Sequence, residues 1–89
     1  MPASPPLPID YTRLRGLTAR RIITALQRDG FILARRKGAT RFFKYADGRR
    51  VTIHLHRPDQ MLPIGTLQEI IENEARWIEE DLRRLGLLS

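Results

Sequence analysis

The sequence predicts a single small α+β domain, in which one helix precedes a three-stranded antiparallel sheet and a second helical region follows it. Three patterns predict this order: apolar residues at helical spacing over residues 18–29, strand-like runs over residues 31–56, and a second helical stripe after residue 66. A chain of 89 residues has room for one hydrophobic core. We therefore expect both helical regions to cover the same face of the sheet.

The first helix is expected from about Thr18 to Asp29. Thr18 is a favourable N-cap and Gly30 a typical C-terminal stop, and the apolar positions between them are Ala19, Ile22, Ile23 and Leu26. Four of the six prolines lie in the first eight residues, where they prevent helix formation. We therefore expect residues 1–12 to form a disordered Pro-rich tail and residues 13–89 to form a single domain.

Three strands are expected next, at Phe31–Ala34, Arg41–Tyr45 and Val51–His56. A basic turn, Arg35–Gly38, would join the first two strands. The Asp47-Gly48 pair predicts a tight hairpin turn before the third.

The second helix is expected to begin at Thr66, because Thr66 and Glu69 form a capping-box pattern. Gly86 would end this region, whose apolar stripe comprises Leu67, Ile70, Ile71, Ala75, Ile78, Leu82 and Leu85. The stripe stays in phase throughout, so one long helix and two short helices are both open. The resulting α-β-β-β-α order is that of double-stranded-RNA-binding domains, with residues 15–73 as the core and residues 74–89 as a C-terminal helical extension.

Charge is divided unequally along the chain. The formal net charge is +6, but residues 1–57 carry +10 and residues 58–89 carry −4. Segregated cations predict a surface that binds a polyanion such as RNA, whereas the acidic second helix would repel phosphate from the surface that duplex binders usually use. The predicted RNA-contacting residues are Arg35, Arg36, Lys37, Gly38 and Arg41 around the basic turn, Arg20 and Arg21 on the first helix, and Arg49 and Arg50 at the second turn.

Two adjacent aromatic residues, Phe42 and Phe43, lie in the second predicted strand. Strand alternation directs their rings to opposite faces, and an exposed ring near the basic turn would stack on an unpaired base. Burial of both rings, under the tail or under a helix, is the alternative.

The composition also excludes several kinds of protein. With no cysteine, the chain has no disulfide framework and no thiolate metal site. No apolar run approaches the roughly 18–20 residues that span a bilayer, and the first residues lack the features of a secretory signal. We therefore expect a cytoplasmic protein with no membrane partner, no bound metal and no small-molecule cofactor.

His54 and His56 share one face of the third predicted strand, opposite the face that bears Val51, Ile53 and Leu55. Two imidazoles without a third ligand at a suitable spacing make a weak metal site. Histidine is the side chain that titrates nearest neutrality, so both residues are candidates for general acid–base catalysis. Two surface histidines without a chemical role are the alternative.

Four segments stand in one order along the chain: Ile23–Phe31, Arg36–Gly38, Asp47–Ile53 and Gly65–Ile71. Together they resemble the HicA family of bacterial toxin–antitoxin mRNA interferases. The resemblance implies the same α-β-β-β-α fold, ribosome-independent cleavage of mRNA, and neutralisation by a cognate HicB-type antitoxin.

The catalytic signature of that family is Gly-Ser-His at the turn between the first two strands, where the histidine transfers protons. The matching residues here are Gly38, Ala39 and Thr40, so Thr40 occupies the histidine position. A threonine does not titrate near neutral pH and cannot replace histidine as a general acid or base. Near the end of the second helix, Arg76 and Ile78 replace the family's Gly and its Ser-or-Thr cap.

Three functional hypotheses follow. In the first, the chain is a metal-independent endoribonuclease in which His56 or His54 transfers protons and the cations of the basic turn hold the phosphate. In the second, it binds RNA or an antitoxin but has lost catalysis. In the third, it is a protein-interaction domain whose acidic C-terminal region forms an interface, with Trp77 either in that interface or in the core.

Overall fold

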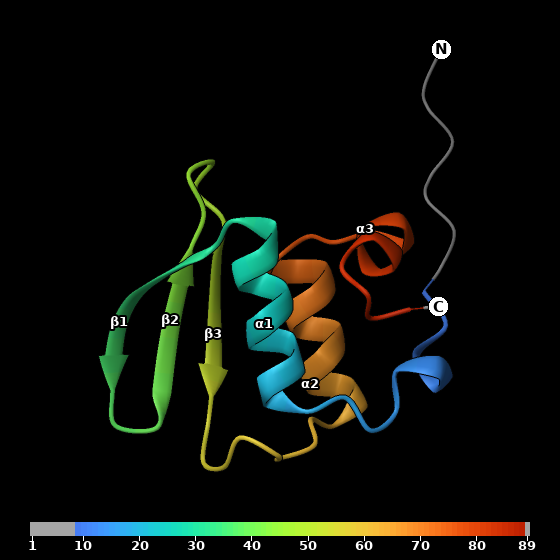
Figure 1. Cartoon of the computed structure of the whole chain (residues 1–89), viewed down its shortest axis with the longest axis horizontal. Coiled ribbons are helices and arrows are strands. Elements are labelled where there is room, and N and C mark those ends of the chain that lie inside the picture. Colours follow the sequence, from blue (N-terminus) through green and yellow to red (C-terminus); the bar gives the residue numbers. More distant parts are fainter. Residues whose placement is uncertain (1–8, 89) are drawn as a thin grey trace.

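The computed structural model describes residues 9–88 and confirms the predicted fold class. Its elements are a 3₁₀ turn η1 (Tyr11–Leu14), helix α1 (Ala19–Asp29), strands β1 (Ile32–Lys37), β2 (Thr40–Lys44) and β3 (Arg50–His54), helix α2 (Ile64–Gln68), a π-helical segment η2 (Glu69–Glu74) and helix α3 (Glu79–Arg84). The strands form one antiparallel sheet in the order β1-β2-β3. Figure 1 shows α1 and α2 side by side against one face of this sheet, with α3 beyond them. Within residues 9–88, no helix is long and apolar enough to cross a membrane.

Helix α1 begins and ends where the sequence predicts. The Thr18 hydroxyl accepts a hydrogen bond of 3.2 Å from the backbone N–H of Arg21, and Gly30 follows the last helical residue in a left-handed conformation. The buried residues of the helix are Ala19, Ile22, Ala25 and Leu26. They pack in one core with the sheet and the other helices, so α1 covers the sheet through its apolar stripe.

Strand β2 is the central strand, and the two faces of the sheet differ in burial. The side chains of Phe43, Val51 and Ile53 are 1–3% exposed and pack in the core against the helices. The opposite face, called the outer face below, is not covered by any helix of the described chain (Figure 1). The expectation that the helices cover one face only is therefore confirmed.

The basic segment Arg35–Lys37 belongs to β1, and the prediction that it forms a turn is wrong. Strand β1 pairs with β2 as far as the Lys37–Thr40 pair, so only Gly38 and Ala39 turn the chain. Gly38 adopts a φ of +59°, a conformation typical of two-residue hairpin loops. The cations therefore stand on a paired part of β1, where alternation separates them between two faces.

A β-bulge interrupts β1. Leu33 pairs with Phe43 and Arg35 pairs with Phe42, which leaves Ala34 as an extra residue on β1. Because side chains alternate along a strand, the bulge reverses the facing of the residues that follow it. Arg35 and Lys37 therefore lie on the outer face and not on the helical side.

The second helix begins at Ile64, two residues before the predicted start, and the expected capping box at Thr66 is wrong. Pro63 precedes the helix with a φ of −58°, and its carbonyl accepts a hydrogen bond of 2.9 Å from the Leu67 N–H. Proline already has a helical φ and has no N–H to satisfy, so it starts the helix without a side-chain cap. The capping pattern at Thr66 and Glu69 lies inside the helix that results.

The predicted apolar stripe is divided between two helices. Segment η2 ends at Glu74, and Arg76 then adopts a φ of +56° before α3 begins. The backbone N–H of Ile78 donates to the Asp81 carboxylate (3.0 Å) at the start of α3. Among the stripe residues only Ile78 is exposed, at 39%; the buried ones are Leu67, Ile70, Ile71, Ala75, Leu82 and Leu85.

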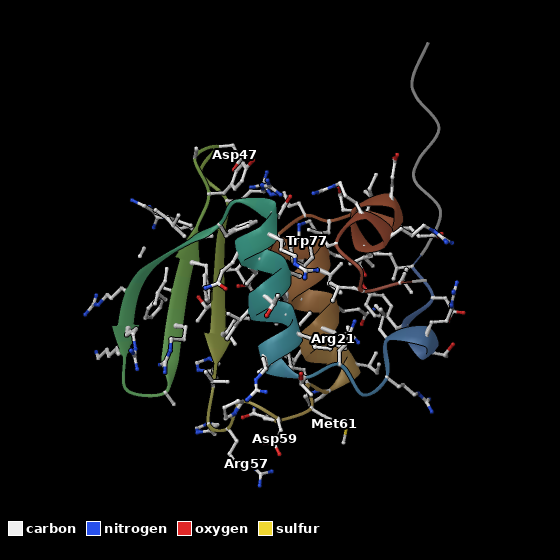
Figure 2. The ribbon with its side chains drawn as sticks, viewed as in Figure 1. Arg21, Asp47, Arg57, Asp59, Met61 and Trp77 are labelled. Carbon is white, nitrogen blue, oxygen red and sulfur yellow. The ribbon has the colours of Figure 1, made fainter. Side chains whose placement is uncertain are left out.

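Asp29, the last residue of α1, fastens the C-terminal helix to the core. Its two carboxylate oxygens accept hydrogen bonds from Trp77 Nε1 and from Arg84 Nη2, each at 2.8 Å. The Trp77 indole is 2% exposed and stands edge-on to the ring of Phe31, between α1 and α3 (Figure 2). Trp77 therefore belongs to the core and not to an exposed partner interface.

The end of the predicted Pro-rich tail is part of the fold. Residues 1–8 lie outside the described residues, whereas Asp10 caps η1 by accepting a hydrogen bond from the Thr12 N–H. The Tyr11 hydroxyl donates to the Glu72 carboxylate of η2. Asp10 and Tyr11 therefore make ordered contacts next to residue 13, the predicted start of the domain.

We expect Arg76→Gly to stabilise the protein. A non-glycine residue in the left-handed region costs about 1–2 kcal/mol, and part of this gain is lost to the greater freedom of glycine in the unfolded chain, so the free energy of unfolding should rise by about 0.5–1 kcal/mol. Urea unfolding monitored by circular dichroism measures the change. Gln68→Gly, within regular helix, is the matched control and should lower stability by about 1 kcal/mol. A loss of stability in Arg76→Gly would contradict the assigned strain.

Candidate nucleic-acid interface

The outer face begins, beside the β1–β2 turn, with a row of three polar side chains. Thr40 lies opposite Lys37 of β1 and opposite His54 of β3 in the strand register. The Thr40 hydroxyl and His54 Nδ1 are hydrogen-bonded at 3.2 Å. Thr40, which the sequence resemblance predicts to stand at the position of the HicA histidine, is therefore bonded to a histidine from the neighbouring strand.

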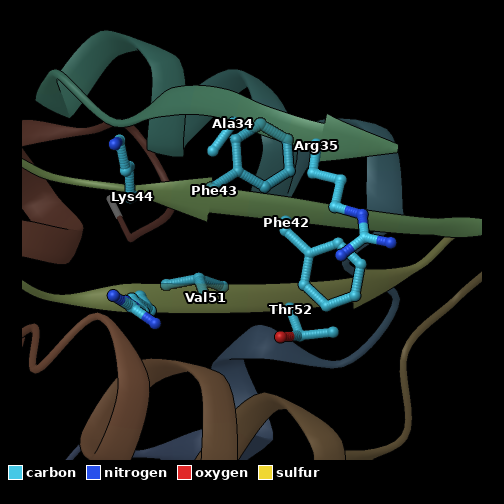
Figure 3. Close-up of a pocket in the computed structure, with 8 residues that line it drawn as sticks. Ala34, Arg35, Phe42, Phe43, Lys44, Val51 and Thr52 are labelled. Carbon is cyan, nitrogen blue, oxygen red and sulfur yellow. The ribbon is translucent and has the colours of Figure 1, made fainter. Parts of the chain in front are cut away.

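The next row along the strands contains an aromatic ring. Phe42 lies opposite Arg35 on one side and opposite Thr52 on the other. These three residues, with Lys44 and Arg50 of the following row, line a hollow of about 490 Å³ on the outer face (Figure 3). The hollow thus combines an aromatic surface, a hydroxyl and three cationic side chains.

The structure decides between the alternatives for the adjacent phenylalanines. Phe43 is 3% exposed and packs in the core, whereas Phe42 lies on the outer face and is only partly buried. One ring therefore stabilises the fold and the other is accessible. The predicted alternation is confirmed, and burial of both rings is excluded.

Cations of the strands have no anionic neighbours on the strands. The three strands contain no Asp or Glu, and within residues 9–88 no ion pair or side-chain hydrogen bond engages five of their cations, Arg35, Arg36, Lys37, Lys44 and Arg50. Lys44 and Arg50 even lie directly opposite one another on the outer face. Like charges at such positions destabilise a sheet, so this arrangement favours binding of a polyanion.

Acidic side chains, by contrast, are mostly engaged within the fold. Asp47 pairs with Arg49 at 2.8 Å, Glu79 pairs with Arg83 at 2.6 Å, and the Asp29 carboxylate binds Trp77 and Arg84 as described above. Each of Asp29, Asp47 and Glu79 therefore has an arginine close by that compensates its charge. The charge segregation seen in the sequence becomes a cationic sheet face in the structure.

Arg36 and Arg41 occupy the other face of the same hairpin. They pair with each other across β1 and β2, and Arg41 lies opposite Ile53, which points into the core. The Arg41 guanidinium donates to the carbonyl of Gly38 at 3.0 Å, so this side chain folds back onto the turn. These two arginines flank the turn but do not lie on the outer face.

Arg49 is held inside the fold. Its guanidinium donates to Asp47 and to the carbonyl of Ala75 (2.5 Å), and it lies 4.5 Å from the ring centroid of Tyr45 and 5.1 Å from that of Phe31. These contacts join the β2–β3 turn to the end of η2. The Arg49 guanidinium is therefore engaged within the fold.

Arg20 and Arg21 both belong to α1, which lies in the helical layer and not on the outer face (Figure 1), and Figure 2 shows Arg21 on that helix. Arg21 Nη2 donates to the carbonyl of Gly86 at 2.9 Å. Together with Arg28, both arginines line a separate pocket of about 300 Å³ beside the end of α3. The predicted RNA-contacting residues are therefore not all on one surface, because Arg35, Lys37 and Arg50 lie on the outer face whereas Arg20 and Arg21 lie on α1.

The two histidines differ in their surroundings. His54 is the last residue of β3, so the prediction that His56 continues the strand is wrong, and His56 lies in the loop that leads to α2. The backbone N–H of His56 donates to Gln60 Oε1 at 3.0 Å. Within residues 9–88, the His56 ring itself makes no hydrogen bond or ion pair. Only His54 is bonded to Thr40.

Glu74 was not identified from the sequence. Its carboxylate accepts a hydrogen bond of 2.8 Å from the Thr52 N–H and thereby closes the exposed edge of β3. Burial raises the pKa of Glu74, while the Thr52 hydrogen bond and the nearby charge of His54 act in the opposite direction. An acidic residue on a helix next to an edge strand can accept a hydrogen bond from an unpaired backbone N–H of that strand, and this pattern could have identified Glu74.

Among residues 9–88, no group of three or more His, Asp or Glu side chains lies close enough together to hold a metal ion.

Comparison with known proteins agrees with this architecture. A search of curated proteins found no match. The family model described as HicA toxin of bacterial toxin-antitoxin matches residues 19–76, which run from the start of α1 to the end of η2 and include the whole sheet. The chain therefore belongs to the HicA family of bacterial toxins.

Proposed function

We propose that this chain is an mRNA interferase, an endoribonuclease that acts in the cytoplasm and is neutralised by a HicB-type antitoxin. The observation that carries the proposal is the hydrogen bond between Thr40 and His54 beside the cation of Lys37. It supplies an imidazole next to the position from which the family's histidine is absent. The outer face around it supplies the positive charge that an RNA strand requires.

The chemistry proposed is attack by a 2′-hydroxyl of the RNA on the adjacent phosphate. In the tautomer whose Nδ1–H donates to Thr40, His54 has a free lone pair on Nε2 and accepts the 2′-hydroxyl proton. The new 2′-O–P bond forms as the 5′-O–P bond breaks, and the leaving 5′-oxygen takes a proton from solvent. The products are a 2′,3′-cyclic phosphate and a free 5′-hydroxyl.

Lys37 and Arg35 hold the phosphate in this proposal. Lys37 lies across from Thr40 in the same row, and Arg35 occupies the next row on the same strand. Their charges would stabilise the extra negative charge on the phosphoryl oxygens in the transition state. Thr40 acts as a positioning residue that orients the imidazole.

His54→Ala should abolish RNA cleavage. Loss of a general base lowers the rate roughly 10²- to 10⁴-fold, whereas affinity for RNA should change little because the cations remain. The assay follows fragmentation of an mRNA transcript by purified protein in the presence of EDTA, with end-group analysis for the cyclic phosphate.

His56→Ala is the matched control and should cleave like the unmodified protein, because among residues 9–88 no hydrogen bond or ion pair joins its ring to the Thr40 row. Thr40→His combined with His54→Ala should recover cleavage, since it returns an imidazole to the family position. Equal cleavage by His54→Ala and the unmodified protein would remove His54 from the mechanism. Intact RNA bound in a salt-dependent manner by the unmodified protein would favour the binding module that has lost catalysis.

Thr40→Val should lower kcat about five- to tenfold and leave KM nearly unchanged, because it removes one hydrogen bond that orients the imidazole. Thr40→Ser keeps the hydroxyl and should retain most of the activity. Steady-state cleavage of one short RNA by the three proteins measures the difference. A change confined to KM would show that Thr40 contacts the substrate instead of positioning His54.

The antitoxin is expected to cover the cationic outer face. Induced expression of the chain alone should arrest growth and fragment mRNA, and co-expression with an adjacent open reading frame for a HicB-type protein should restore growth and yield a complex that copurifies. Replacing Arg35 and Lys37 together by Glu should weaken that complex, because charge complementarity across the interface is reversed. A complex that is insensitive to this double change would place the antitoxin elsewhere.

A further inference from the structure

We propose that the outer face binds single-stranded RNA with one unpaired nucleobase stacked on Phe42, one row away from the Thr40–His54 pair. The inference deepens the proposed function by naming the form of the substrate, and its binding step does not require cleavage. It assigns the hollow around Phe42 to a base and the surrounding cations to the flanking phosphates.

The spacing of the rows supports this placement. Phe42 and Thr40 are two residues apart on β2 and therefore share the outer face, about 6–7 Å from one another along the strand. Neighbouring nucleotides of an extended strand can follow such a step. A base on Phe42 would thus place an adjacent phosphate near His54.

The hollow has the groups that recognise a nucleotide. Arg35 reaches from β1 toward the Phe42 ring, and Lys44 lies at the far end of the hollow (Figure 3). Arg50, which pairs with Lys44 across β2 and β3, also lines the hollow. The Thr52 hydroxyl lies on the same face, and within residues 9–88 it has no hydrogen-bond partner. An aromatic plane bordered by cations and one free hydroxyl suits a base together with its phosphates.

When no antitoxin covers the outer face, an unpaired base is favoured in the hollow over a duplex and over another protein. The Phe42 ring can stack only on the face of a base, and both faces are hidden inside a double helix. A protein surface would have to place an apolar group on the ring among three cations without a neighbouring acid on the strands. RNA supplies the aromatic surface and the negative charge in one molecule.

The test compares two strands that carry the same charge. One is a 2′-O-methyl RNA octamer, which lacks the attacking hydroxyl, and the other is an abasic octamer with the same sugar-phosphate backbone. The unmodified protein should bind the base-bearing strand roughly tenfold or more tightly than the abasic strand, as expected for base–aromatic stacking. Phe42→Ala should lose this preference while its affinity for the abasic strand stays the same.

Phe42→Trp should keep the preference, and Ile32→Ala, which shortens an exposed apolar side chain on the same sheet, is the matched control that should not change it. Circular dichroism checks that each variant is folded. Equal affinity of the unmodified protein for both strands would overturn the proposal, as would tighter binding of a duplex of the same sequence. The two octamers cannot be cleaved, so binding is measured independently of catalysis. If the protein prefers the base-bearing strand but does not cleave RNA, only the proposed catalysis is refuted. If it cleaves RNA but shows no preference, only the stacking site is refuted.

Discussion

The register of β2 between its two neighbours determines which side chains can meet on the outer face. The two-residue turn fixes the pairing of β2 with β1. The pairing of β2 with β3 places Thr40 opposite His54. Because side chains alternate with a period of two, a slip of one residue would send Phe42 into the core and expose Phe43. Core packing by Phe43, Val51 and Ile53 prevents that slip. The same strand register thus determines which side chains pack against the helices and which side chains form the outer face.

Internal use of acidic side chains sharpens the electrostatic contrast between the two layers. Asp29 holds Trp77 and Arg84, and Glu74 holds the edge of β3, so both carboxylates stabilise the fold. The ion pair between Asp29 and Arg84 cancels charge locally, whereas the strand cations act together over several ångströms. A domain with a modest net charge can therefore present a strongly positive sheet. Attraction between this face and RNA should weaken as salt concentration rises.

Features set by local sequence could be predicted, and features set by tertiary contacts could not. Thr18 and Gly30 define α1 through their own conformations, and strand alternation was sufficient to separate Phe42 from Phe43. Strand alternation alone did not predict which of the two rings faces the helices, because the choice of face depends on the register of the whole sheet. The Thr40–His54 bond joins two strands whose pairing depends on the same register. The break after η2 was ambiguous because an arginine, not a glycine, adopts the left-handed conformation there.

The bulge at Ala34 has a consequence for how the free protein behaves towards copies of itself. Strand β1 forms an edge of the sheet, and an edge strand is a template on which another chain can add a strand. The bulge kinks this edge, and three consecutive cations end it, so a second sheet would meet both a misaligned ladder and charge repulsion. Arg35 and Lys37, which would hold RNA, therefore also protect the toxin, once it is released from its antitoxin, against aggregation through its open edge.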